Sequence, residues 1–366
     1  MPQAPTYDLP ALDDFAATCQ RFEAWWNCEV TDRPPVTLYT CDQPARPPGP
    51  AAPTYADHRA RWFDIEQRLA AHAHAVSHTR YVGDTVPTFM PNLGPEVVAT
   101  CYGAELTFTD STSWAEPCCA SAAEVCQRQL SRDGAYWQWI LNATKRSLEL
   151  GAGKWLTAGT DLHTSGDLIA ALRDPQEILL EMALDDAAVD TAMHHLAGIF
   201  EPLYRDQADP IRAIGQPMLS WTNCLCDGFG GVVQCDLICM LSPAHFQRFI
   251  LPLLQEEMAF LDRSLFHLDG PGALRHLDDF IACDDLDAIQ WVYGAGGGKA
   301  SDWTEVYQRI QAGGKAMHIV CADLNDARGV MQAIGPAGAW FEIHGSYPMA
   351  EVDAFLKEVT EWRAPR

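Results

Sequence analysis

The chain has 366 residues, of which 48% are hydrophobic and 20% charged, as in soluble globular proteins with a sizeable core. Its formal net charge of -24 argues against nucleic acids and anionic membrane surfaces as partners, because both require clustered Lys and Arg side chains. No apolar run approaches the roughly 18 residues that span a bilayer, and no basic, apolar leader opens the chain. We therefore expect a cytoplasmic protein that does not enter the membrane.

The 13 cysteines are an odd number, scattered and mostly set in apolar surroundings. The two tighter groups, Cys118-Cys119 and Cys224-x-Cys226, lack the paired Cys-x-x-Cys spacing of a structural zinc site. This usage predicts reduced, buried thiols rather than a disulfide scaffold.

The chain alternates short β-like runs with longer helical ones. Residues 1–30 have the spacing of an amphipathic helix, and the proline-rich segment 42–54 predicts an irregular connector. Short runs rich in β-branched and aromatic residues are apolar on both faces, as in strands of a parallel sheet that is covered on both sides. These predicted strands are 34–40, 80–89, 154–162, 231–241, 264–270, 288–294, 315–324 and 339–345.

Helices are predicted between the later strands. One begins at Ser242 as N-cap and continues through residue 261, with a kink at Pro252, and another runs from Asp302 to the Gly313-Gly314 stop. Eight strands separated by helices fit a single (β/α)₈ barrel over residues 35–366, preceded by a helical extension over 1–34. A doubly wound sheet needs an early phosphate-binding turn, and the late GAGGGK segment matches neither nucleotide fingerprint.

Polar residues gather where the predicted strands end, which is where a barrel builds its active site. Alternation along a strand places His267 and Asp269 on one face, and likewise Glu342 and His344. Asp and Glu are rarely buried without partners, so this accumulation at one rim indicates a site. The full set is Asp84, Asp161, His163, Asp236, His267, Asp269, Glu342 and His344.

A divalent metal is the sharpest hypothesis for this set. His267, Asp269 and His344 would supply two imidazoles and one carboxylate, a ligand set that suits zinc first, and also iron or manganese. Glu342 would be a fourth ligand or a general base, and Asp84 and Asp236 would bind or protonate substrate or orient a ligating imidazole. The alternative is that these side chains pair with one another without a metal.

Three residues are assigned to substrate binding: His163 from this set, and also Trp291 and His276. The last two have a plainer alternative. Trp291 would pack in the barrel wall, and His276 would begin a helix beyond the Gly-Pro-Gly turn.

The order of several segments resembles that of the uroporphyrinogen decarboxylase superfamily. GVVQCDLICMLSPAHFQRFILPLL has a strand with an Asp, then a Leu-Ser-Pro turn and a Phe-rich helix, in the order found in that superfamily. DLHTSGDLIAALRDPQEILLEM is similar to the middle segment of the superfamily. SLFHLDG lies where the corrinoid-dependent and related zinc methyltransferases of that superfamily carry a His-x-Cys-Gly strand end. FEIHGSYPMAEVDAFL resembles the last strand and the final helix of that superfamily. The resemblance covers most of the chain from about residue 35 and implies a single (β/α)₈ barrel.

The resemblance also separates the activities of the superfamily. The arginine-rich clamp of the porphyrinogen decarboxylases is missing, since the first strand is followed by CDQPARPPGP, although Asp84 lies near their essential aspartate. The methyltransferase histidine matches His267, but their two cysteines match Asp269 and His344. Oxygen and nitrogen in place of thiolates make a harder site and widen the choice of metal.

The expected function is a metal-dependent methyltransferase or demethylase that moves a methyl group between a small molecule and a corrinoid or tetrahydrofolate carrier. A corrinoid protein would be its partner, and a homodimer is expected by analogy. One alternative is a cofactor-free decarboxylase of a small carboxylated substrate, in which Asp84 protonates the departing carbon. The other is a non-catalytic barrel that binds a small molecule or a corrinoid.

Overall fold

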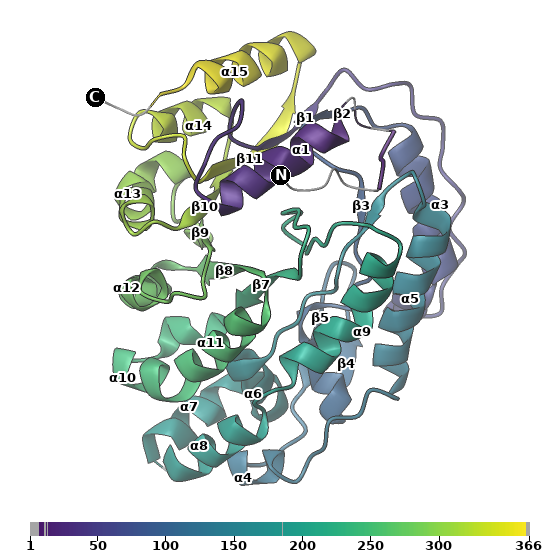
Figure 1. Cartoon of the computed structure of the whole chain (residues 1–366). Helices are drawn as coiled ribbons and strands as arrows, with labels where there is room; N and C mark the ends of the chain where they lie inside the picture. Colours follow the sequence, from purple (N-terminus) through teal and green to yellow (C-terminus); the bar gives the residue numbers. More distant parts are fainter. Residues whose placement is uncertain (1–6, 11, 13, 185, 364–366) are drawn as a thin grey trace.

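The computed structural model describes residues 7–10, 12, 14–184 and 186–363 and has a mixed α/β architecture, with helices outside a curved, largely parallel sheet (Figure 1). The strands are β1 (Val36–Thr40), β2 (Tyr81–Gly83), β3 (Thr88–Phe89), β4 (Glu105–Phe108), β5 (Ser113–Glu116), β6 (Leu156–Thr157), β7 (Gly230–Gln234), β8 (Arg263–Asp269), β9 (Ala288–Val292), β10 (Ala316–Cys321) and β11 (Ala339–Tyr347). The α-helices are α1 (Phe15–Trp26), α2 (His58–Phe63), α3 (Ile65–Ser77), α4 (Ala122–Val125), α5 (Ala135–Gly151), α6 (Ser165–Arg173), α7 (Pro175–Leu184), α8 (Asp186–His195), α9 (Phe200–Ala213), α10 (Pro243–His245), α11 (Leu251–Phe260), α12 (Leu277–Ile281), α13 (Thr304–Ala312), α14 (Leu324–Met331) and α15 (Met349–Glu361).

The central sheet has the strand order β2-β1-β11-β10-β9-β8-β7. Neighbouring strands in it are parallel, except that β2 runs antiparallel to β1. Each predicted strand run contains an observed strand, but the two-residue strands β3 and β6 pair only with each other. Within the described residues, β2 and β7 are therefore the edges of the sheet, and the strand hydrogen bonds do not close a barrel.

The sheet has an apolar layer on each of its faces. Outward side chains such as Phe266, Ile289 and Phe341 belong to a large core shared with the surrounding helices. Inward side chains near the start of five strands form a second core with α1, and they are Val232, Leu265, Ala288, Ala316 and Trp340. The alternation of directions along each strand thus separates the two cores.

Helix α1 closes the amino-terminal end of these strands. The Trp25 side chain of α1 donates from Nε1 to the Met317 carbonyl oxygen at 3.1 Å, and Phe22 of the same helix packs edge-on against Trp340. The helix begins at Phe15, where Asp14 accepts a hydrogen bond from the Ala17 amide, and so is shorter than the predicted 1–30. The first part of that prediction, residues 1–6, lies outside the described residues.

The helical segment after β7 follows the predicted capping and kink. Ser242 accepts the His245 amide at 3.2 Å, and a π-helical turn, Phe246–Ile250, interrupts the helix just before Pro252. Among the helices that the structure describes, none is both long enough and apolar enough to cross a membrane.

Candidate metal and active site

A polar layer lies on the inward face of the sheet, directly above the apolar one. It is built by the positions two residues further along each strand, where apolar side chains give way to amides, imidazoles and a carboxylate. Parallel pairing keeps them level, since Gln234 pairs with His267, and His267 with Gln290. The layer consists of Gln234, His267, Gln290, His318 and Glu342.

Four members of this layer form a continuous hydrogen-bonded chain. The Gln290 side chain bonds through Oε1 to His267 Nδ1, and through Nε2 to His318 Nδ1 at 2.8 Å. His318 Nε2 donates to Glu342 Oε2 at 3.0 Å, and Trp340 stacks on the His318 ring at a centroid distance of 3.6 Å. Because an amide oxygen only accepts, His267 must carry its proton on Nδ1, which leaves the lone pair of Nε2 free for a ligand.

Burial and hydrogen bonding together set the charges along this chain. His318 is fully buried, and this lowers its pKa although Glu342 acts in the opposite direction. Burial is the largest single influence on Glu342 and raises its pKa, but the hydrogen bond from His318 and the attraction of His318 and His344 together outweigh burial, so the net shift of the pKa is downward. The structure therefore holds a neutral imidazole between an amide and a carboxylate anion.

Two carboxylates complete a cluster around His267. Ligand atoms of Asp236, His267 and Asp269 all lie within 4.8 Å of one another. Asp269 Oδ1 is buried without a hydrogen-bond partner, and burial and the neighbouring Asp167 raise the pKa of Asp236. An unsatisfied buried carboxylate oxygen is costly, and a divalent cation would satisfy it. One imidazole and two carboxylates fit a metal of intermediate hardness.

A second cluster adjoins the first and shares Asp236. Ligand atoms of His163, Asp167 and Asp236 also lie within 4.8 Å of one another. His163 lies between two carboxylates, with Nε2 3.1 Å from Asp161 Oδ2 and Nδ1 3.1 Å from Asp167 Oδ2. Burial lowers the pKa of His163, but the two carboxylates outweigh it and raise that pKa well above its usual value. This imidazole is therefore a cation that neutralises its neighbours.

Asp167 also fixes the turn that carries Asp236. Its carboxylate accepts the amides of Asp236 at 3.0 Å and Leu237 at 3.1 Å, where the short 3₁₀ helix Asp236–Met240 begins. The Cys239 thiol of the same turn donates to the Asp269 carbonyl oxygen at 2.9 Å. The turn after β7 is thus tied both to α6 and to the end of β8.

His344 lies outside both clusters. It is on β11 with its side chain 63% exposed, and its Nε2 is 4.0 Å from Glu342 Oε1. The predicted triad of His267, Asp269 and His344 is therefore not assembled, and Asp236 takes the third place. Glu342 is brought to the polar layer, where it bonds to His318.

The prediction of a catalytic Asp84 is wrong in its geometry. Because β2 is antiparallel to β1, its carboxyl end lies beside Val36, at the amino end of β1. Asp84 is fully buried there and accepts hydrogen bonds from Arg21 at 2.9 Å, from Arg33, and from the Val36 amide at 2.8 Å. It anchors the segment around α1 at the opposite end of the strands from the clusters.

Two predicted substrate contacts lie in the core instead. Trp291 follows the inward Gln290, so it points outward, where it is fully buried and packs edge-on against Trp303. His276 is fully buried, donates from Nε2 to the Ile238 carbonyl oxygen at 3.1 Å, and packs on Phe246. Burial lowers the pKa of His276. The core-packing alternative is therefore correct for both.

Sequence reasoning missed Gln290, His318 and Asp167. The first two occupy the same inward register as His267, so applying the two-residue rule to every strand would have found them. Asp167 lies within α6, where nothing in its surroundings in sequence marks it.

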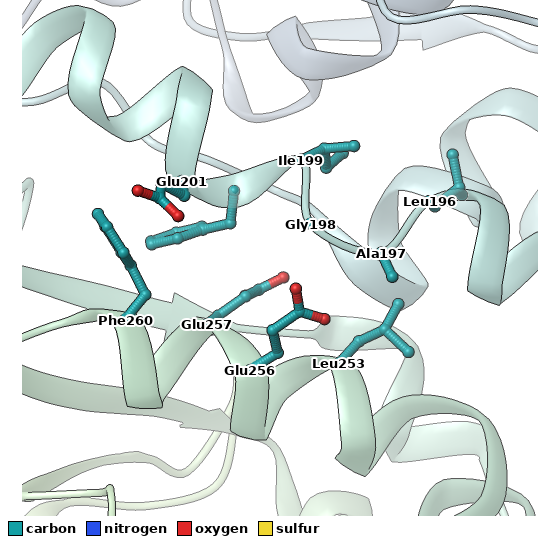
Figure 2. A pocket seen from close by; sticks show the side chains of 10 residues that line it. Leu196, Ala197, Gly198, Ile199, Glu201, Leu253, Glu256, Glu257 and Phe260 are labelled. Atoms are coloured by element: carbon teal, nitrogen blue, oxygen red, sulfur yellow. The ribbon is translucent and has the colours of Figure 1, made fainter.

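Cavities lie beside the polar layer and also apart from it. One of about 170 Å³ is lined by Glu342 and His344, and it adjoins another of about 360 Å³. A separate cavity of about 70 Å³ lies between the α8–α9 connection and α11, where Glu256 and Glu257 face it (Figure 2). Burial raises the pKa of Glu257 to about 7, and Thr164 donates to its carboxylate at 2.6 Å. This cavity contains none of the predicted site residues.

No protein-family model matches the chain, and no curated protein matches its sequence. A solved structure of a methyltransferase from Methanosarcina mazei is similar, with a TM-score of 0.57 over 94% of this chain and 98% of that chain. The two sequences are 12% identical, so the likeness is one of fold. The chain therefore shares its mixed α/β architecture, over almost its whole length, with a methyltransferase.

Proposed function

We propose that the protein is a metal-dependent methyltransferase or demethylase that moves a methyl group between a small molecule and a corrinoid or tetrahydrofolate carrier. The observation that carries the proposal is the cluster of Asp236, His267 and Asp269, in which Asp269 Oδ1 is buried and unpartnered. The fold shared with a methyltransferase supports the choice of reaction class. In the same proposal, β3 and β6 take the second and third places of an interrupted eight-stranded barrel.

Zinc, iron or manganese would be held by His267 Nε2 and by carboxylate oxygens of Asp236 and Asp269. Such an ion acts as a Lewis acid that stabilises an anion developing on a bound group. The chain contributes the rest. Gln290 holds His267 in the tautomer that leaves Nε2 unprotonated, and the cationic His163 compensates the carboxylates of Asp161 and Asp167.

Elemental analysis of the purified protein tests the metal site. We expect about one equivalent of metal in the native protein and its loss in His267→Ala and Asp269→Asn, because the first variant removes the ligand nitrogen and the second removes the carboxylate charge. His344→Ala is the matched control, since this exposed imidazole lies outside the cluster and its loss should leave the metal content unchanged. A native protein that takes up no metal even on reconstitution would contradict the proposal.

The reaction class is tested separately with methylcobalamin and 5-methyltetrahydrofolate. We expect the metal-loaded protein to transfer the methyl group of one of them to an added thiol or tertiary amine, which forms the new bond to the methyl carbon, and the chelator-treated protein to lose that activity. We do not favour the cofactor-free decarboxylase, because it would use Asp84 as proton donor. Asp84 is buried in ion pairs at the other end of the strands. Decarboxylation that persists in chelator would reverse this choice.

A further inference from the structure

Two adjoining cavities open beside the polar layer, and we refer to them together as the mouth cavity. They have volumes of about 360 and 170 Å³ and share the lining residues Tyr39, Val86 and Asn223. Trp221 lines the larger one, and its ring packs edge-on against His267 at a centroid distance of 5.1 Å. A ligand in the mouth cavity would therefore lie next to Trp221, whose ring contacts His267 of the acidic cluster.

The walls of the mouth cavity are aromatic. Tyr39, Tyr81 and Trp221 line the larger part, and Tyr39 is 49% exposed although it belongs to the central sheet. His72 lies in the same wall, and burial lowers its pKa to about 4, so it adds no charge. The faces of aromatic rings carry negative charge density, so a cavity lined by several rings can hold a diffuse cation against such faces.

The charge of the mouth cavity points to the same kind of ligand. Among the described residues that line it, none is Lys or Arg, and Glu342 contributes a carboxylate. This wall offers no counter-charge to an anionic ligand. The chain as a whole has a formal net charge of -24, which attracts cations further.

We propose that the mouth cavity binds a small methylated ammonium ion, held by the faces of Tyr39, Tyr81 and Trp221 and by the carboxylate of Glu342. A metal ion would need several oxygen ligands, whereas a quaternary ammonium group suits aromatic walls with one nearby anion. The mouth cavity is large enough for a molecule of this size.

The assignment of this ion as methyl source rests on the proposed function. In that role the C–N bond breaks with its electron pair remaining on nitrogen, so that a quaternary ammonium leaves as a tertiary amine. The lone pair of a reduced corrinoid acceptor forms the new bond to the methyl carbon. Binding itself requires neither the acceptor nor the metal.

Calorimetric titration tests binding with choline and its neutral isostere 3,3-dimethyl-1-butanol. At pH 8, above the ordinary histidine pKa, we expect saturable choline binding and at least about tenfold weaker binding of the isostere. Tyr39→Leu should weaken choline binding about tenfold, whereas Tyr39→Phe, which keeps the ring, should bind nearly as the native protein does. Glu342→Gln, which can still accept the hydrogen bond from His318, is the second variant and should weaken choline but not the isostere.

Three results would overturn the proposal: no saturable choline binding to the folded native protein, equal binding of the isostere, or choline binding unaffected by both Tyr39→Leu and Glu342→Gln. The same titration with chelator-treated protein separates this proposal from the proposed function. Retained choline binding in a protein that neither holds metal nor demethylates a carrier would keep the mouth cavity and reject the methyltransferase. Metal-dependent demethylation without choline binding would do the reverse.

Discussion

Two imidazoles near the acidic cluster differ in charge: His318, which Gln290 links to His267, is neutral, whereas His163, which lies next to Asp236, is a cation. His318 bonds to Gln290 at 2.8 Å and to Glu342 at 3.0 Å, and burial lowers its pKa. His163 is as close to two carboxylates, at 3.1 Å each, and its pKa is raised well above the usual value. Burial is the largest single influence on both, so the second carboxylate decides the charge.

The comparison teaches that a neutral and a charged imidazole perform different tasks around the same site. The neutral His318 accepts from Gln290, which in turn orients His267 and leaves its Nε2 open to a ligand. The cationic His163 neutralises carboxylates that would otherwise repel one another around Asp236. The neutral His318 fixes the orientation of its hydrogen-bonded neighbours, whereas the charged His163 compensates the negative charge of the acidic cluster.

The largest effect is expected from removing the cation. His163→Leu leaves Asp161 and Asp167 without their partner, and breaking a largely buried ion pair costs roughly 3–5 kcal/mol of unfolding free energy. Urea denaturation measures it. Adding Asp161→Asn to this variant should recover part of the loss, because one unpaired charge is then removed. A loss below about 1 kcal/mol would contradict the charged assignment.

The same pair predicts a pH dependence. Because the pKa of His163 is raised in the folded protein, its stabilisation is complete below the unfolded value of about 6.5. It is lost as the pH rises through the folded pKa. Urea midpoints of the native protein and His163→Leu should therefore converge at alkaline pH.

Glu257 extends the comparison to a buried carboxyl group that has no cation among the groups that shift its pKa. Its pKa of about 7 lies above the ordinary 4.5, so folding binds a proton and stability falls as pH rises from about 4.5 to 7. Glu257→Gln should remove this dependence and stabilise the protein by roughly 2–3 kcal/mol at pH 8, with little change at pH 4. Thermal unfolding at the two pH values measures it. Glu256→Gln should lessen the dependence only slightly, because Glu256 is exposed and has the smallest of the influences that shift the pKa of Glu257.

Gln290→Leu removes the amide that links His267 to the neutral His318. The variant leaves Nδ1 of both His267 and His318 without a partner, which should cost roughly 1–3 kcal/mol. Imidazole nitrogen NMR provides a more specific measurement, because the His267 proton should distribute over both ring nitrogens. Gln290→Glu is the companion variant, and a second carboxylate beside His318 should raise its pKa as in His163. A single His267 tautomer retained in Gln290→Leu would contradict the role of the amide.

The smallest effect is expected from Glu342→Gln. The side chain is 39% exposed, and the amide oxygen can still accept from His318, so stability should change by about 0.5 kcal/mol or less. His318 should remain neutral. A protonated His318 in this variant at pH 7 would contradict the assignment of a neutral imidazole held so by burial.

Local patterns predicted the strands and one half of the site. Period-two alternation correctly placed His267 and Asp269 together, because side-chain direction in a strand depends only on neighbouring residues. The rule that site residues stand where strands end misplaced Asp84, since nothing in the sequence around β2 shows that it runs antiparallel to β1. Alternation also left open the orientation of Trp291, which the pairing of β9 with β8 and β10 decides.

The sequence by itself determined the alternation of strands and helices and the pairs of residues that share a strand face. These properties depend on residues close together in the chain. Only the tertiary structure decided that Asp236 joins His267 and Asp269, and that His163 meets two carboxylates whereas His318 meets one. Protonation and ligand geometry arise from groups on separate elements, so they depend on burial and distances that no local pattern contains.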